Sequence, residues 1–383
     1  MKVGINGMGR LGQTVLRAAM GAVQRAADDP RRDNRLDIVH LNDFRGNTAT
    51  LAQRLKSDSI HGAWSADVEA IDNSQLRIGD RLLRFTSNAA PADIPWHELG
   101  VELVIECSGK FLAAGAVQGH LYRGVKRVIV AAGIDACGVV NLMMGINEQC
   151  YDPARHAVVA AGCSVTNCLA PIIKVVHEAI GIRHGQIITI HDPTHASLGM
   201  ATQDGEHAPA RSVLSSLRGA TNDSGAGHLA ASGNTVAVPD ADLRLSPAAA
   251  RGQAQVANDN ETSIALVYPE LRGKISGRAV QVPVLHAALT DCTFELRRVS
   301  SAEEVNVLFA QAARSALPGI LDYQPGSRPG GEYARDTRSC IIDGPATLVT
   351  DGTLLKVFAW HGNEMGYACR LVDLATHMRG VGI

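Results

Sequence analysis

The sequence lacks three features that would assign it at once to a common functional class. Its 383 residues include 36 lysines and arginines against 38 aspartates and glutamates, so we expect neither nucleic acid nor an anionic membrane as a partner. No run of about 18 apolar residues occurs and no signal peptide precedes the first glycine loop, so we expect a cytoplasmic chain without a membrane span. None of the eight cysteines forms a C-x-x-C pair with partner histidines, so we expect reduced thiols and no metal site.

The first residues predict a nucleotide-binding turn between a strand and a helix. The apolar run Lys2–Ile5 leads into three glycines with G-x-G-x-x-G spacing. In that pattern Gly7 permits the tight turn, Gly9 lets a pyrophosphate approach the backbone, and Gly12 lets the helix pack on the strand. We expect a helix over 13–20 whose N-terminal amides face the phosphates. Taken alone, the motif is also compatible with a glycine-rich turn without function. The candidate cofactor-binding residues of this turn are Asn6, Gly7, Gly9, Arg10, Leu11 and Gly12.

A second predicted strand supports the dinucleotide interpretation. The apolar run Leu36–Leu41 ends in Asn42 and Asp43, and an acid at that point can accept hydrogen bonds from the adenosine ribose. Asp43 follows Gly12 by 31 residues rather than the usual 20 or so, and a charged surface loop over 26–33 accounts for the excess. The carboxylate favours NAD over NADP because it would repel a 2′-phosphate, although the nearby Arg45 weakens this preference.

Three further strand-like runs complete the pattern of the N-terminal part. They cover Leu82–Phe85, Leu103–Cys107 and Val128–Ala132. Strands that alternate with helical segments are typical of a Rossmann-like, doubly wound parallel sheet of the α/β class. We therefore expect an NAD-binding domain over residues 1–163.

Motifs spread over most of the chain resemble those of the phosphorylating glyceraldehyde-3-phosphate dehydrogenases. They are Gly162–Leu169 (GCSVTNCL), Lys56–Gly62 (KSDSIHG), Met144–Asn147, Tyr268–Lys274 and Asn363–Tyr367 (NEMGY). The resemblance implies a second, α+β catalytic domain with a mixed or antiparallel sheet over 164–363, and a C-terminal helix at about 364–383 that completes the first domain. It also implies NAD as cofactor, a small phosphorylated aldehyde as substrate and a homotetramer. The run Leu289–Cys292 is more similar to the subgroup associated with arsenate resistance.

The resemblance also assigns catalytic roles, and it places a serine where the family has its nucleophilic cysteine. Counted back from Cys168, that position is Ser164, and the thiol has moved one residue to Cys163. His191 follows Ser164 by 27 residues, which is the family's spacing from nucleophile to base. Both Ser164 and Cys163 are therefore candidate nucleophiles, and a one-residue shift should turn Cys163 away from His191. The family's cofactor contacts fall on Ser108, Gly109 and Asn363.

Substrate recognition departs from the family pattern in two places. Gln281 stands where the family has a phosphate-binding arginine, and glutamine lacks the charged, forked donor of that side chain. Thr194 remains at a substrate-phosphate position. Residues 199–260 form an atypical insertion rich in Gly, Ala, Ser and Asp. Two hypotheses stay open: an active NAD-dependent aldehyde dehydrogenase that makes an acyl phosphate or acyl arsenate, and a non-catalytic NAD-binding relative that acts as a regulator or interaction protein.

Overall fold

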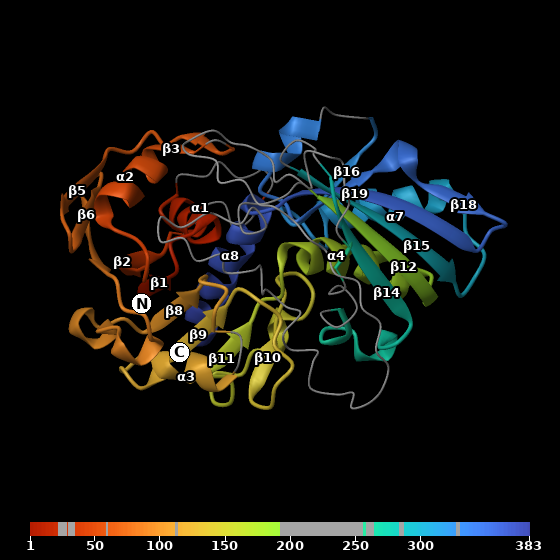
Figure 1. Ribbon diagram of the computed structural model, residues 1–383. Coiled ribbons are helices and arrows are strands. Elements are labelled where there is room, and N and C mark those ends of the chain that lie inside the picture. The colour runs from red at the N-terminus through yellow and green to blue at the C-terminus, as the bar shows by residue number, and fades with distance from the viewer. Residues whose placement is uncertain are drawn as a thin grey trace, which may run out of the picture.

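The computed structural model contains two sheets that lie side by side (Figure 1). It describes residues 1–21, 29, 35–58, 60–111, 114–191, 256–257, 264–282, 287–326 and 330–383. The predicted insertion at 199–260 lies outside the described residues apart from the two-residue strand β13 (Val256–Ala257), and most of the predicted surface loop at 26–33 also lies outside them. No helix in the described part of the chain is long and apolar enough to cross a membrane.

The first sheet is mainly parallel and has nine strands in the order β10-β11-β9-β8-β1-β2-β7-β6-β5. The parallel strands are β1 (Lys2–Asn6), β2 (Asp37–Asn42), β7 (Arg81–Thr86), β8 (Leu103–Glu106), β9 (Arg127–Val130), β10 (Val139–Asn141) and β11 (Val158–Ala160). The antiparallel edge consists of β5 (Val68–Asp72) and β6 (Gln75–Ile78). All four residues of β8 are buried, as expected for a parallel strand that is covered on both faces. The predicted doubly wound sheet is confirmed, and its predicted strands differ from the observed ones by one or two residues at their ends.

Strand β1 marks the point where the chain changes direction across this sheet. The chain runs from β1 through helix α1 (Arg10–Ala19) to β2 on one side, and later places β8 on the other side of β1. In open α/β sheets a ligand binds at the carboxyl ends of the strands beside such a switch point. The candidate cofactor residues other than Asn363 therefore lie at or just after the ends of β1, β2 and β8.

Smaller elements surround the first sheet and the connections between the sheets. The helices are α2 (Thr48–Lys56) and α3 (Ala114–Leu121), and a two-stranded ribbon pairs β3 (Ser57–Asp58) with β4 (Gly62–Ala63). Short 3₁₀ helices occupy Pro91–Asp93, Trp96–Leu99, Glu148–Cys150, Pro269–Leu271, Gly330–Arg335 and Gly344–Ala346.

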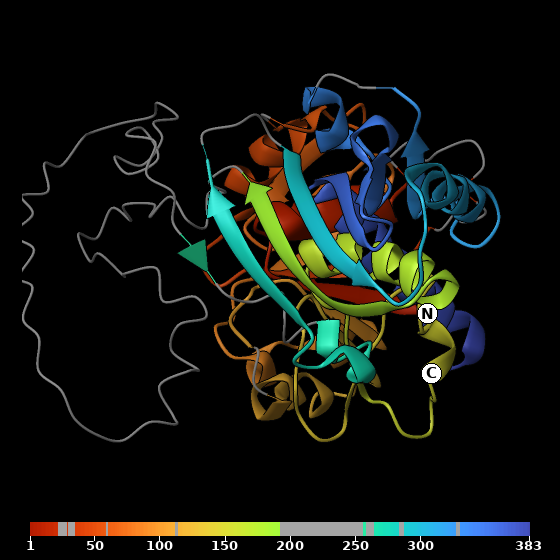
Figure 2. The ribbon, with the colours of Figure 1, turned by 90° about the vertical axis from the view of Figure 1, so that its right-hand side faces the viewer.

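The second sheet is mixed and has the order β13-β14-β12-β15-β19-β17-β16, with β18 paired to β19. Its remaining strands are β12 (Ile182–His191), β14 (Ile275–Gln281), β15 (Ala287–Leu296), β16 (Leu321–Gln324), β17 (Cys340–Asp343), β18 (Leu348–Thr350) and β19 (Leu354–Gly362). Figure 2 shows the long strands β14, β12 and β15 next to one another; β12 is parallel to β14 and antiparallel to β15. Helix α4 (Ser164–Ala179) contacts β12, β15, β17 and β19, while α7 (Ala302–Arg314) packs on β16 and α4. The expected mixed sheet is confirmed.

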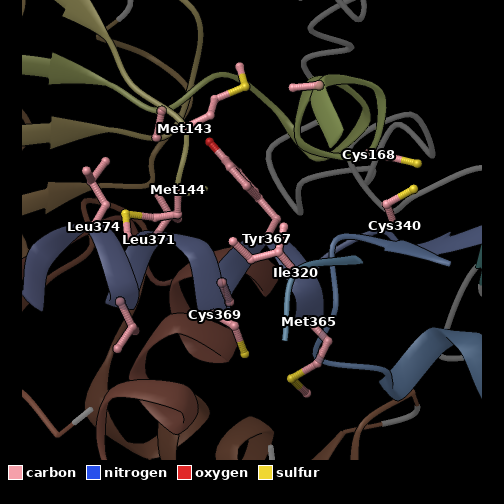
Figure 3. Close-up of a cluster of buried hydrophobic side chains, with 14 of the residues drawn as sticks. Met143, Met144, Cys168, Ile320, Cys340, Met365, Tyr367, Cys369, Leu371 and Leu374 are labelled. Carbon is pink, nitrogen blue, oxygen red and sulfur yellow. The ribbon is translucent and has the colours of Figure 1, made fainter. Parts of the chain in front are cut away.

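The C-terminal helix α8 (Met365–Val381) joins the two sheets into one core. It packs against α1 and also contacts α4 and β19. Figure 3 shows its residue Leu371 beside Met144, from the first half of the chain, and its residue Tyr367 beside Ile320, near the second sheet; all four belong to one core cluster. The full burial of a leucine such as Leu371 contributes about 1.5–3 kcal/mol. The assignment of this helix to the nucleotide-binding domain and the division after residue 163 both stay predictions.

Candidate active site

The three glycines at the end of β1 differ in what surrounds them. Gly7 has φ +89°, and a Cβ on it would lie 2.5 Å from the backbone N of Ser108. A Cβ on Gly12 would lie 2.0 Å from the Gly7 carbonyl oxygen, so only glycine lets α1 begin this close to the turn. A Cβ on Gly9 would meet no atom within 4 Å. Gly9 therefore leaves open space over the backbone, where a pyrophosphate can approach the first turn of α1.

A buried chain of hydrogen bonds connects the ends of β2, β1 and β8. The side-chain amide of Asn42 donates to Asn6 Oδ1 at 2.8 Å, and the amide of Asn6 donates to Glu106 Oε2. The other carboxylate oxygen of Glu106 accepts the backbone N–H of Ser108 at 2.7 Å. Glu106 is only 2 % exposed, so these donors compensate the burial of its carboxylate. The same hydrogen bonds fix the ends of the three strands relative to one another.

Two aromatic residues orient Glu106 from the opposite side. The indole N–H of Trp96 donates to His120 Nδ1 at 3.0 Å, so this ring carries its proton on Nε2. That Nε2 lies 3.0 Å from Glu106 Oε2 and donates to it. Trp96 and His120 are both fully buried, and they fix the rotamer of the carboxylate that supports the turn at Ser108.

A cavity that is open to solvent lies above this network. Among the residues that line it are Asn6, Gly7, Gly9, Asp43 and Ser108. These are five of the residues predicted to bind the cofactor, and they come from the ends of three neighbouring strands. The arrangement fits a dinucleotide, because the Gly9 backbone is open to the phosphates and Asp43 is available to the ribose.

Asp43 is held by backbone donors on both carboxylate oxygens. Oδ2 accepts the N–H of Met8 at 2.9 Å, and Oδ1 accepts the N–H of Arg45 at 3.1 Å. Each oxygen keeps a lone pair for a ribose hydroxyl. Beside it, the ammonium of Lys110 lies 4.4 Å from the centre of the exposed Phe44 ring, which places a cation and an aromatic face at the mouth of the same cavity.

The remaining predicted cofactor residues do not line this cavity. Arg10 and Leu11 lie in the first turn of α1: Arg10 Nε lies 3.1 Å from Glu364 Oε1, and Leu11 packs against the main core. Gly109 has φ +68° and open space around it, directly after Ser108. Asn363 is half-buried in the turn between β19 and α8, beside Glu364.

A tight turn links β11 to α4, the helix that carries the candidate nucleophiles. Gly162 adopts φ +65°, which favours glycine, and its carbonyl oxygen accepts the hydroxyl proton of Tyr367 from α8. The Asn167 amide donates to the Ala161 oxygen at 2.9 Å and to the Cys163 oxygen at 3.0 Å. These bonds fix the direction in which the first residues of α4 leave the strand.

Cys163 is the N-cap of α4, and Ser164 is its first helical residue. The Cys163 sulfur accepts the backbone N–H of Thr166 at 3.5 Å and lies 3.1 Å from the Thr166 hydroxyl oxygen. The thiol is therefore directed at the helix N-terminus, where a serine or threonine usually caps. Ser164 is half-buried in the first turn of α4. The catalytic roles of both residues stay predictions.

The predicted base and substrate residues lie where the central strands of the second sheet end. His191 is the last residue of β12 and is paired in register with Gln281, the last residue of β14. The His191 carbonyl accepts the N–H of Val282 at 3.0 Å, and its ring is half-buried. Thr194 lies outside the described residues.

A group of thiols is buried where α4 packs on β15 and β17. Cys168, Cys292 and Cys340 are fully buried and belong to the same core, and Figure 3 shows Cys168 next to Cys340. Burial by itself raises the pKa of Cys168, but interaction with the Cys340 thiol and with the charge of His361 lowers it overall. Burial raises the pKa of Cys340 well above its ordinary value. No group of three or more His, Cys, Asp or Glu side chains in the described part of the chain is arranged to hold a metal ion.

Two parts of the cofactor site were not predicted from the sequence. Glu106 anchors the buried network, and the signal was available, because it is a lone acid in an otherwise apolar strand. Phe44 and Lys110 form the mouth of the cavity, and single exposed residues of these types carry no pattern that distinguishes them.

Comparisons with known proteins agree with this geometry. The family model described as "Glyceraldehyde 3-phosphate dehydrogenase, NAD binding domain" matches residues 1–114, and the model described as its C-terminal domain matches residues 163–228 and 227–363. Glyceraldehyde-3-phosphate dehydrogenase 3 of Nostoc sp. is 39% identical over 376 residues, covering 98% of this chain and 97% of the relative. Glyceraldehyde-3-phosphate dehydrogenase 1 of Streptomyces avermitilis is 35% identical over 375 residues (98% and 97%), and glyceraldehyde-3-phosphate dehydrogenase 1 of Bacillus cereus is 34% identical over 382 residues (100% and 99%). With its first domain built for NAD and both family domains matched, the chain belongs to the glyceraldehyde-3-phosphate dehydrogenase family of NAD-binding oxidoreductases.

Proposed function

We propose that the chain oxidises a small phosphorylated aldehyde with NAD and releases an acyl phosphate or acyl arsenate. NAD, when bound, supplies the hydride acceptor for the aldehyde carbon. Ser164 Oγ attacks that carbon while His191 takes the hydroxyl proton and stabilises the developing oxyanion; loss of a hydride from the hemiacetal carbon then leaves an ester on Ser164. Phosphate or arsenate then attacks the resulting ester and frees Ser164.

The path of α4 and β12 is the observation that carries this proposal. The helix runs from Ser164 to Ala179, and β12 returns along it after a turn at Gly181. The helix is about 24 Å long at 1.5 Å per residue, and β12 covers that length in about seven of its ten residues at 3.3 Å each. His191, the last of the ten residues, therefore lies about three residues beyond the level of the helix N-terminus, and we propose that its side chain reaches back to Ser164 from there.

We choose Ser164 rather than Cys163 as the nucleophile because the Cys163 side chain caps the N-terminus of α4. A thiol of ordinary pKa, about 8.5, is the better nucleophile in general. The Cys163 thiol, however, is engaged with Thr166 at the N-terminus of α4. Ser164 has no such bond among the described residues, and its hydroxyl needs base activation, which His191 would provide.

A second candidate function is favoured by the same residues. An oxygen at the nucleophile position forms an ester that leaves phosphate less driving force than a thioester, and Gln281 supplies no charge for an anion. A chain with an intact NAD cavity and a weak nucleophile would serve as a non-catalytic NAD-binding protein, a regulator or interaction partner. The resemblance to the family supports two further proposals, a division into residues 1–163 with the C-terminal helix and residues 164–363, and assembly as a homotetramer.

The test measures NADH formation by absorbance in the purified chain with glyceraldehyde 3-phosphate, NAD and either phosphate or arsenate. Binding of NAD is measured in parallel by calorimetry. The variants are Ser164→Ala, Ser164→Cys and Cys163→Ser, the last of which keeps a good helix cap. The Ser164→Ala variant is the matched control for the serine mechanism.

Turnover of roughly 1–10³ s⁻¹ in the wild type, lost in Ser164→Ala and kept in Cys163→Ser, supports the oxidoreductase with a serine nucleophile. Loss of turnover in Cys163→Ser alone would move the nucleophile to Cys163 and overturn the assignment to Ser164. A wild type that binds NAD without forming NADH, beside an active Ser164→Cys variant, overturns the enzymatic proposal and supports the non-catalytic one.

A further inference from the structure

Two fully buried thiols and a buried histidine meet where α4 packs on the second sheet. Cys168 lies on α4, Cys340 is the first residue of β17, and His361 lies near the end of β19. Strands β17 and β19 are antiparallel with Ile341 opposite Trp360, so the preceding residue of β17 brings Cys340 opposite His361. Residues that lie opposite one another in a sheet project from the same face, so these two side chains are neighbours.

The thiols of Cys168 and Cys340 are also neighbours. Figure 3 shows the two side chains pointing toward one another from α4 and β17, and each thiol acts on the other. The third buried thiol, Cys292, lies opposite Val357, four residues along β19 from His361. That separation is about 13 Å at 3.3 Å per residue. Cys340, and not Cys292, is therefore the thiol that lies beside both Cys168 and His361.

His361 contributes a buried polar ring whose bonding potential the core leaves unused. Its side chain is 1 % exposed, and neither ring nitrogen forms a well-aligned hydrogen bond within the described part of the chain. Burial raises the pKa of Cys168, but the Cys340 thiol and the charge of His361 lower it overall, whereas burial raises the pKa of Cys340. The pair therefore divides into a thiolate on Cys168 and a protonated thiol on Cys340.

We propose that Cys168 and Cys340 form an oxidisable pair that reacts with hydrogen peroxide, with His361 transferring the protons. The Cys168 thiolate attacks one peroxide oxygen, the O–O bond breaks, and the leaving hydroxide takes a proton from His361, which gives one water and a sulfenic acid on Cys168. His361 then takes the proton of the Cys340 thiol, and the Cys340 sulfur attacks the Cys168 sulfur. The S–O bond breaks, and the leaving hydroxide takes that proton to form a second water. Two thiols are oxidised to a disulfide, and one peroxide is reduced to two waters.

The position of Cys168 limits which oxidants can reach it. Ser164 precedes Cys168 by four residues on the same face of α4 and is half-buried, so about one helical turn separates the thiol from solvent. Hydrogen peroxide has only two heavy atoms. Oxidised glutathione must bring one of its own sulfur atoms, with a tripeptide on each side, against the attacking thiolate. The buried pair should therefore react with the peroxide and not with the bulky disulfide.

The test treats the reduced full chain with hydrogen peroxide or with oxidised glutathione. The oxidant is removed, free thiols are alkylated in urea, and the peptides are mapped by mass spectrometry without reduction. After peroxide we expect the peptides that contain Cys168 and Cys340 to be joined, and to separate on reduction. Oxidised glutathione should leave this pair reduced. The exposed Cys137 and Cys150 show in the same map that each oxidant reached the protein.

Three variants separate the roles of the side chains. Cys340→Ser should stop the reaction at the sulfenic acid, which dimedone traps on Cys168. His361→Gln should slow formation of the disulfide at least about tenfold, because the proton transfer is lost. Cys292→Ser is the matched control, a buried thiol outside the pair, and should leave the rate unchanged. Urea unfolding shows whether each variant is folded.

The wild-type map decides the proposal even if a variant does not fold. The proposal is overturned if Cys168 and Cys340 stay reduced while the exposed thiols are oxidised, or if Cys168 becomes joined to a different cysteine. Equal rates in the wild type and in a folded His361→Gln variant would overturn the role of His361. These outcomes are covalent bonds read without turnover, so they do not depend on which residue is the nucleophile.

Discussion

Acidification from pH 6.5 to 4 should destabilise this fold through a single buried histidine, His40 on β2. Its Nε2 lies 2.9 Å from the Thr86 hydroxyl oxygen, and that hydroxyl donates onward to Asn42 Oδ1 at 2.8 Å. His40 must therefore be the donor, with its proton on Nε2. The other ring nitrogen, Nδ1, has no hydrogen-bond partner in the described structure, and the ring packs on Trp96 with centroids 4.6 Å apart. A second proton would be a buried charge without an acceptor.

The size of the effect follows from the lowered pKa of His40. Burial first, and then the positive charge of Arg84, lower this pKa from 6.5 to about 4, while Glu98 acts in the opposite direction. Between pH 6.5 and 4 the unfolded chain binds a proton at His40 that the folded chain does not, so stability is complete above 6.5 and falls as the pH falls. At 1.36 kcal/mol per pH unit the loss reaches about 2 kcal/mol at pH 5 and about 3 kcal/mol at pH 4.

Urea unfolding at fixed protein concentration, between pH 7.5 and 4.5, measures this loss. The control is His40→Gln, whose amide can still donate to Thr86 but has no proton to gain. Carboxylates titrate in both proteins, so the difference between the two curves isolates His40. The wild type should lose about 2 kcal/mol more than the variant between pH 7 and 5. Parallel curves for the two proteins would refute the assignment of a lowered pKa to this ring.

Three further predictions concern the two halves of the site. Glu106→Gln should lower the free energy of unfolding by about 2–3 kcal/mol in urea, because an amide cannot accept from all the donors that the carboxylate now satisfies. Gly12→Ala should lower the free energy of unfolding by at least about 1–3 kcal/mol, because the added methyl group overpacks the turn. The free energy of unfolding of Gly9→Ala should stay within about 1 kcal/mol of wild type. In calorimetry Gly9→Ala should nevertheless weaken NAD roughly tenfold, and unchanged affinity would show that the open space over Gly9 is not the phosphate site. Cys163→Ser should raise the free energy of unfolding by about 0.5–1 kcal/mol, because a hydroxyl accepts the Thr166 N–H better than a thiol does. Thermal unfolding measures this change, and a lower melting temperature than that of the wild type would contradict the capping role.

The sequence was sufficient for those parts of the fold that local pattern controls. The glycine spacing at 7, 9 and 12 predicted a turn whose packing requires glycine at two of the three positions. Apolar runs such as Leu103–Cys107 predicted the strands of the first sheet to within two residues. These features depend on local backbone geometry and on burial. Both are visible in the spacing of glycines and in the pattern of apolar residues along the sequence.

What could not be predicted depends on contacts between residues far apart in the chain. The bond from Trp96 to His120 and from there to Glu106 joins three segments whose side chains become neighbours only when the sheet has formed. The capping role of Cys163 could not be predicted either. The sequence shows that the thiol is displaced by one residue, but it does not show that the side chain turns toward the N-terminal amides of α4. The order of residue types along the sequence does not change with the orientation of a side chain, so it cannot reveal that orientation.

The contact between the last helix and the strand–helix turn bears on how the protein is made. Tyr367 of α8 holds Gly162, just ahead of Ser164, and the same helix covers α1. A ribosome that adds 5–20 residues per second needs about 20–70 s to reach Tyr367 after starting the chain. Once α1 has been made, the face that α8 later covers stays exposed on the nascent chain, so we expect holding chaperones to bind that face until synthesis is nearly complete.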